Sequence, residues 1–275
     1  MKITEKDSAL SFLGSLEEHL NKCLPSAAEM VRIITAIVHE SKESGLARHT
    51  NFAEAAFLNW FIAPSLHQFL VQHHGLNKEE ARRALLSESF RGLPEYGSGT
   101  PARPHLHPFS KVIAATPQAI MKQWKEPGRR SLVRSCPDFA LRAPSRHKVV
   151  FEGKYFADGG IAAAETALAA GIYQAFFYRA LPPITETSKH RSWDYDYACF
   201  LAFDATENGS LQKAWNSVSN EVKITGFWEG ANIYVMILRG AANTSMNPPP
   251  LVAAAPSGCL ARKERSLGAG YRQNR

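Results

Sequence analysis

Two short stretches near the middle of the chain carry residue types that can do chemistry. Residues 136–139 read Cys-Pro-Asp-Phe, and residues 151–155 read Phe-Glu-Gly-Lys-Tyr. Both lie in segments of strand character, which we predict to form strands over 131–141 and 147–156 with a short basic turn between them. Strand alternation places Glu152 and Lys154 on one face of a strand that is apolar on both sides. Such a strand is expected to be buried, and buried charges need partners or a function.

Pairing of these two strands would bring Asp138, Glu152 and Lys154 together. Asp138 follows Pro137, which cannot donate to a strand ladder and so favours an edge or a bulge. Two carboxylates beside one lysine suit a hard divalent cation such as Mg²⁺, which completes its shell with water and phosphate oxygens. The metal would polarise a phosphoryl group and lower the pKa of a bound water. The lysine could orient that water, stabilise the developing charge or take the proton.

These residues resemble the motif of the PD-(D/E)XK nuclease superfamily, with Pro137-Asp138 as the first element, Glu152-Gly153-Lys154 as the second, and thirteen residues between Asp138 and Glu152. The resemblance covers roughly residues 50–240. It implies an α/β fold with a restriction-endonuclease-like mixed sheet in the order αβββαβ. It also implies that Asp138 and Glu152 bind Mg²⁺ (or Mn²⁺ in its place), with the Gly153 carbonyl as a further ligand, and that Lys154 is catalytic. Taken alone, each motif half favours the alternative of an ordinary turn or a surface charge pair on a hairpin; the two halves together, in order and followed by a helix, favour the nuclease.

Two further elements extend the resemblance. Gln174 and Tyr178 share a helix face and look like the QxxxY signature of the exonuclease branch, which implies a site role for Gln174 and a DNA contact for Tyr178. Small residues at 170–171 on that stripe would let the helix approach the sheet. The alternative is a buried hydrogen-bonding pair. Glu54, on an apolar helix stripe, is a candidate third acidic site residue, but with Asn51 it also forms a capping box that would explain it fully.

The remaining pattern predicts which elements hold these residues. We predict helices and strands at these positions: helices over 8–22 and 26–44, a helix from Asn51 past Trp60 that bends or breaks at Pro64, a helix over 77–90 capped by Asn77, loop over 92–108, a helix over 160–181, and strands over 195–203 and 233–238 with a helix near 209–219 between them. We divide the chain into a helical N-terminal elaboration (1–50), the nuclease core (51–240) and a basic, disordered tail (241–275).

The distribution of charge and the composition indicate which partners and which cellular compartment to expect. The net charge of +7 is concentrated: residues 129–154 carry net +5, and the segment from Arg239 onwards carries another +5. Arg142, Arg146 and Lys148, in the turn beside the proposed site, are therefore candidate phosphate contacts. No apolar run is long enough for a membrane span, and no signal peptide is expected. The four cysteines lack metal or disulfide spacing and suggest free thiols in the cytoplasm.

From these observations we expect a Mg²⁺-dependent deoxyribonuclease that hydrolyses DNA by in-line attack of a metal-bound water. A type II-like restriction endonuclease is the first choice, because the chain carries no helicase motifs, and double-strand cleavage at a symmetric site would favour a homodimer. The QxxxY element favours instead an exonuclease or a repair nuclease. Two other hypotheses stay open: a noncatalytic nucleic-acid-binding module on the same fold, and an α/β protein in which the motif is coincidental. DNA and RNA are not distinguished at this level.

Overall fold

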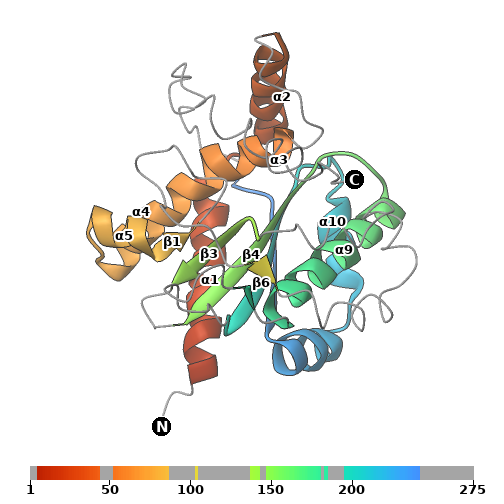
Figure 1. Cartoon of the computed structure of the whole chain (residues 1–275). Coiled ribbons are helices and arrows are strands. Elements are labelled where there is room, and N and C mark those ends of the chain that lie inside the picture. Colours follow the sequence, from red (N-terminus) through yellow and green to blue (C-terminus); the bar gives the residue numbers. More distant parts are fainter. Residues whose placement is uncertain are drawn as a thin grey trace, which may run out of the picture.

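The computed structural model is a mixed α/β protein built on a central sheet (Figure 1). It describes residues 5–43, 52–86, 103–104, 137–142, 147–180, 183–184 and 195–241. The sheet has five strands in the order β1-β3-β4-β6-β7: β1 Leu85–Leu86, β3 Phe139–Arg142, β4 Lys148–Phe156, β6 Tyr197–Asp204 and β7 Ile233–Leu238. The β1–β3 and β3–β4 pairs are antiparallel, whereas the β4–β6 and β6–β7 pairs are parallel. Two short strands, β2 (Arg103–Pro104) and β5 (Pro183–Ile184), form a separate pair.

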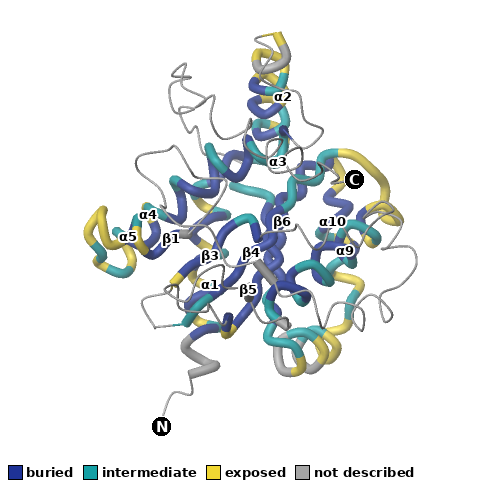
Figure 2. The backbone as a smooth tube through the Cα atoms, viewed as in Figure 1, coloured by how far each residue is buried: buried dark blue, intermediate teal, exposed yellow. Residues whose placement is uncertain are grey.

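Helices cover both faces of the sheet. The described helices are α1 Glu5–Cys23, α2 Ala27–Glu43, α3 Phe52–Phe57, the π-helix η1 Leu58–Ile62, α4 Ala63–His74, α5 Lys78–Ala84, α9 Ile161–Ala180, α10 Ser210–Ser217 and the π-helix η2 Val222–Glu229. The N-terminal helices α1 to α5 share one apolar core with the sheet, and α9 and α10 share a second core on the opposite face. Figure 2 shows the resulting pattern, with buried strands at the centre and exposed residues towards the outer ends of helices.

Strand alternation determines which core each side chain enters. In β4, Phe151 and Tyr155 pack in the core of the N-terminal helices, whereas Val150 and Phe156 pack in the core formed with α9. The predicted two-faced burial of this strand is therefore confirmed. The parallel connection from β4 to β6 runs through α9, as a parallel pair requires a crossover segment.

Small residues in α9 let it lie close to the sheet, as predicted. A Cβ atom added to Gly171 would lie 1.9 Å from Cε2 of the Phe200 ring in β6. No real Cβ fits at that distance, so glycine is required for this helix-to-sheet approach.

The helix that begins near residue 52 is interrupted just before Pro64, as predicted. α3 gives way to the π-turn η1, and the N–H of Ala63 bonds back to the carbonyl of Leu58. α4 then starts with Pro64 in its first turn, where the missing N–H costs no intrahelical bond. It ends at Gly75, whose φ of 65° is the left-handed conformation that terminates helices.

The prediction of a single helix over 77–90 was wrong at Leu85 and Leu86, and residues 87–90 lie outside the described residues. The capping box is present, since the Asn77 side chain accepts from the Glu80 N–H and the Glu80 side chain accepts from the Asn77 N–H. Leu85, however, has extended backbone angles and pairs with Leu141 at the sheet edge. Leu85 is completely buried there, so tertiary burial overrides the helical pattern after α5.

Several expectations concern residues that lie partly or wholly outside the described residues. The loop over 92–108 falls mostly, and the tail beyond residue 241 falls wholly, outside the described residues. Cys23 and Cys199 are free thiols, and Cys136 and Cys259 lie outside the described residues. Within the described part, no helix combines the length and the apolar character needed to cross a bilayer.

Candidate active site

The strands β3 and β4 separate at the point where the charged residues begin. Their register pairs Phe139 with Phe151, and its continuation sets Asp138 opposite Glu152. Asp138 does not continue the ladder with its backbone. Instead its side-chain Oδ2 accepts a hydrogen bond from the Gly153 N–H at 2.8 Å. Of the described strand pairs of β4, only that with β6 extends past Phe151. The predicted edge at Pro137-Asp138 is therefore present, and it leaves one side of the end of β4 without a strand partner among the described residues.

Lys154 lies between two carboxylates at this end of β4. Its Nζ is 2.5 Å from Glu152 Oε1 and 3.4 Å from each carboxylate oxygen of Glu54. Glu54 comes from α3, one hundred residues earlier in the chain. Its ion pair with Lys154 gives Glu54 a role at this site, whereas its capping partner Asn51 lies outside the described residues. The structure thus places Lys154 in contact with both Glu54 and Glu152, with Asp138 beside them.

Burial makes the electrostatics of this cluster unusual. Glu152 is only 2% exposed, while the side chain of Lys154 is 31% exposed. Burial raises the pKa of Glu152 to about 8; Lys154 opposes this rise, and the nearby charges of Asp138 and Glu54 add to it. Burial alone would lower the pKa of Lys154, but the carboxylates of Glu152, Glu54 and Asp138 more than offset it and raise that pKa well above 10.5. The lysine is therefore a permanent ammonium in this arrangement.

The glycine between Glu152 and Lys154 has a packing reason that the sequence did not reveal. A Cβ atom at Gly153 would lie 2.5 Å from Cδ2 of Leu58. Leu58 follows Glu54 by four residues and therefore lies on the same side of the helix. The close approach of Leu58 to Gly153 accordingly places Glu54 within reach of Lys154. Glycine at the middle position of the Glu-Gly-Lys motif thus leaves room for Leu58, on the side of the helix that also carries Glu54.

The donor set has the chemistry of a hard-cation site. Three carboxyl groups, those of Glu54, Asp138 and Glu152, lie around a single ammonium, and burial is the main cause of the raised pKa of Glu152, with the charges of Asp138 and Glu54 adding to it. Carboxylate oxygens are the ligands that Mg²⁺ and Mn²⁺ accept. As the side chains stand, no three His, Cys, Asp or Glu residues of the described chain are grouped as a metal site. The donor chemistry fits a divalent cation, and the Lys154 ammonium lies in the gap between Glu152 and Glu54.

Gln174 and Tyr178 do form a pair on α9. The Gln174 amide donates to the Tyr178 hydroxyl at 3.0 Å. Tyr178 is 2% exposed and packs in the core between α9 and the sheet. This is the geometry of the buried hydrogen-bonding pair that was the alternative to a site role. Their predicted roles at the site and towards DNA remain predictions.

The basic residues of the β3–β4 turn lie at the other end of the hairpin from the carboxylates. Arg142 pairs in register with Lys148, and Arg146 falls outside the described residues. Lys148 is six strand positions from Lys154, which corresponds to about 20 Å along the strand. The expectation that this turn adjoins the site is therefore corrected for Arg142 and Lys148. The physical reason is the antiparallel register, which sends the two ends of a hairpin in opposite directions.

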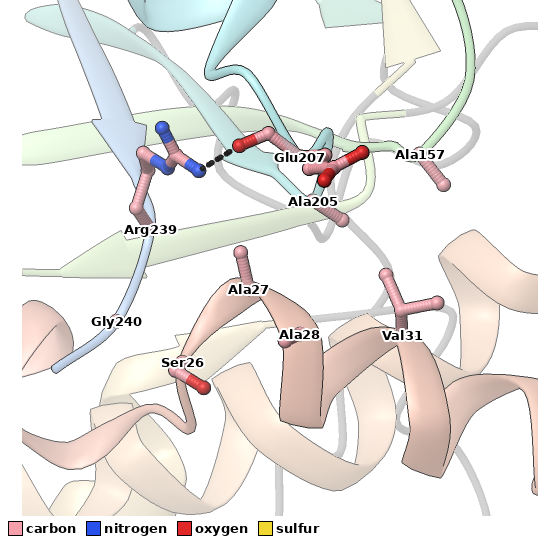
Figure 3. Close-up of a pocket in the computed structure, with 9 residues that line it drawn as sticks. All are labelled: Ser26, Ala27, Ala28, Val31, Ala157, Ala205, Glu207, Arg239 and Gly240. Atoms are coloured by element: carbon pink, nitrogen blue, oxygen red, sulfur yellow. Dashed lines mark hydrogen bonds between the residues drawn. The ribbon is translucent and has the colours of Figure 1, made fainter. Parts of the chain in front are cut away.

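A separate cavity lies beyond the carboxyl ends of β4, β6 and β7 (Figure 3). Its volume is about 680 Å³, and small residues of α2 face Ala157, Ala205 and Arg239 across it. The Arg239 guanidinium donates to the backbone carbonyls of Thr206 and Glu207 and so holds the turn after β6. None of the four residues of the carboxylate–lysine cluster lines this cavity. The pattern of the sequence contained no signal for it, because its lining consists mostly of small residues from separate segments.

Comparison of the chain with models of known families, with curated proteins and with solved structures finds no match. The assignment of a function therefore depends on the residues and their geometry.

Proposed function

We propose that this protein is a metal-dependent nuclease that hydrolyses DNA phosphodiester bonds. One observation carries the proposal: Lys154 contacts Glu152 and Glu54 at the end of a buried strand, with Asp138 bonded to the intervening Gly153. Residues more than eighty positions apart converge there, although either motif half alone would be unremarkable. Burying charged groups costs folding free energy. Clusters of ionisable groups in largely buried positions therefore point to functional sites.

The order of elements supports the same proposal. A helical segment containing Glu54 precedes an antiparallel run β1-β3-β4, which is followed by α9 and then by the parallel strand β6. This is the order helix, three strands, helix, strand that the resemblance to the PD-(D/E)XK superfamily implies. In this order Glu54 lies on the first helix, Asp138 precedes β3, and Glu152 and Lys154 lie on β4.

In this proposal the carboxylates of Asp138, Glu152 and Glu54 would hold Mg²⁺, or Mn²⁺ in its place. The bound cation would polarise the phosphoryl group and supply a hydroxide-like water. The chain's own contribution is positional. Asp138 is oriented by the Gly153 N–H, and Lys154 offers a fixed positive charge for a phosphate oxygen. Lys154 would orient the attacking water, stabilise the developing charge or take the proton.

Cleavage assays test this function. The protein is incubated with supercoiled plasmid, with an end-labelled linear duplex and with RNA, in Mg²⁺ and in EDTA. We expect Mg²⁺-dependent DNA cleavage that Lys154→Ala reduces at least about a hundredfold, in line with the loss of a group acting on the transition state. Lys213→Ala, at an exposed position of α10, is the matched control and should keep full activity. Discrete fragments would identify a restriction-type endonuclease, and progressive shortening an exonuclease or a repair nuclease. Undiminished cleavage by Lys154→Ala would refute the assignment.

A noncatalytic nucleic-acid-binding module is the second candidate. The observation in its favour is that Glu152 and Glu54 already have a counter-ion in Lys154. Such a module would bind nucleic acid without cleaving it and would not require a metal ion. Calorimetry with Mn²⁺ distinguishes the two: metal binding that Asp138→Ala abolishes favours the nuclease, whereas identical isotherms favour the binding module.

A further inference from the structure

We propose that Lys154 is a built-in counter-ion that occupies the cation position of its own site, and that a divalent metal enters only as the ammonium leaves the gap between Glu152 and Glu54. This inference rests on the proposed function and specifies how the same site is loaded. It follows from where Nζ lies: within 2.5 Å of one carboxylate and 3.4 Å of the other. A metal ion ligated by both of these carboxylates would have to take the place of the ammonium.

The charges in the cluster indicate why such an exchange is needed. Three carboxyl groups lie around one ammonium among the described residues of the cluster, so that once all three are ionised the group lacks two positive charges. One divalent cation supplies that amount. In the absence of metal, Lys154 screens the two carboxylates nearest to it, Glu152 and Glu54. Because cation and ammonium repel each other, the two would not share the gap, and the lysine leaves as the cation enters.

The rest of the site is arranged to persist through this exchange. Asp138 is held by the backbone N–H of Gly153, and Glu54 is positioned by the packing of Leu58 against Gly153. Neither anchor involves Lys154. The long, partly exposed lysine side chain is the member of the cluster that can move without disturbing the fold. After displacement its charge becomes available to a substrate phosphate, which couples metal loading to the placement of the lysine.

The exchange predicts an unusual effect on metal affinity, measured without any cleavage reaction. Isothermal titration calorimetry with Mn²⁺ is carried out on the full-length chain and on the variants Lys154→Met, Glu54→Gln and the double variant. Removing the competing ammonium should tighten Mn²⁺ binding about tenfold or more. Lys213→Met should leave the affinity unchanged, because this control residue is exposed on α10. In the double variant most of the gain should disappear, because Glu54 is a ligand once the ammonium has gone.

Each result has a separate meaning. Tighter binding by Lys154→Met, reversed by adding Glu54→Gln, supports the exchange. Equal or weaker binding by Lys154→Met overturns it while leaving the nuclease proposal intact. Tighter binding that Glu54→Gln does not reduce overturns the placement of the metal in the gap. Absence of Mn²⁺ binding in every protein overturns the metal site, and with it the proposed function.

Folding is checked in the same samples by circular dichroism. Without metal, Lys154→Met should melt at a lower temperature than the unmodified chain, because the carboxylates have lost their counter-ion. Added Mn²⁺ should raise the melting temperature of this variant more than that of the unmodified chain. If Lys154→Met does not fold, Lys154→Gln replaces it in the titration. An equal Mn²⁺-induced shift in variant and unmodified chain would contradict the exchange.

Discussion

Glu152→Gln should stabilise the metal-free protein while abolishing the proposed nuclease activity. The buried carboxyl of Glu152 has its pKa raised from 4.5 to about 8, so folding at neutral pH requires it to take up a proton. An amide has nearly the same shape and is always neutral. The variant therefore avoids the cost of protonation but cannot serve as an anionic ligand.

The size of the effect follows from this pKa shift. At pH 7 the unfolded carboxyl is ionised, and protonating it costs 2.303RT for each pH unit above 4.5, which is about 3 kcal/mol. The bond from Lys154 to Glu152 is weakened by the substitution, but Lys154 retains Glu54. We expect a net gain of roughly 2 to 3 kcal/mol at pH 7.

The sign of the pH dependence is part of the prediction. A raised acid pKa means that the folded state holds more protons than the unfolded state between pH 4.5 and about 8. The stability of the unmodified chain therefore falls, relative to that of the variant, as the pH rises through this window. Below pH 4.5 the two proteins should be equally stable, and above pH 8 the difference should level off at about 5 kcal/mol or less.

Urea unfolding in EDTA, followed by circular dichroism from pH 4.5 to 9, measures the difference. Glu207→Gln, at an exposed glutamate, is the control and should change stability by less than about 0.5 kcal/mol at every pH. A variant that is less stable than the unmodified chain at pH 8, or a difference that does not vary with pH, would show that burial does not raise the pKa of Glu152. The same variant should show no Mg²⁺-dependent cleavage.

Two further substitutions test packing and electrostatics away from the site. Gly171→Ala should destabilise the fold by about 2 kcal/mol or more, because its Cβ would collide with the Phe200 ring, whereas Gly14→Ala in α1 has open space and should be neutral or slightly stabilising in thermal melts. Equal melting temperatures for these two variants would contradict the close α9 approach. Glu17→Gln should stabilise the protein increasingly as pH rises above 4.5, because burial raises the pKa of Glu17, whose carboxylate accepts from the Tyr234 hydroxyl; a pH-independent difference in urea midpoints would refute this.

Periodicity in the sequence was enough to predict most of the elements, because each signal is local. The apolar spacing of α1 and α2, the capping box of α5 and the two-faced pattern of β4 depend on residues within a few positions of one another. The failure at Leu85–Leu86 has the opposite origin. These residues leave the helix to pair with β3, more than fifty positions later, and no local pattern contains that information.

The sequence predicted the site residues where their contacts are between neighbouring strands, but not where the contacts are between distant segments. Asp138, Glu152 and Lys154 lie on two strands that follow each other closely, so that pairing of neighbouring strands was sufficient to bring them together. The involvement of Glu54 remained balanced against a capping role, since a contact across one hundred residues depends on how α3 packs on β4. The distance of Arg142 and Lys148 from the site also required the observed register.

The sequence by itself determined the residue types available for chemistry and the order of the elements that carry them, because both are properties of local stretches. Only the tertiary structure decided which residues lie at the site and in which direction their pKa values shift. The packing of Leu58 on Gly153 admits Glu54, and the burial of Glu152 beside two other carboxylates raises its pKa. Both effects arise from the removal of water and the approach of distant segments, which a linear pattern does not encode.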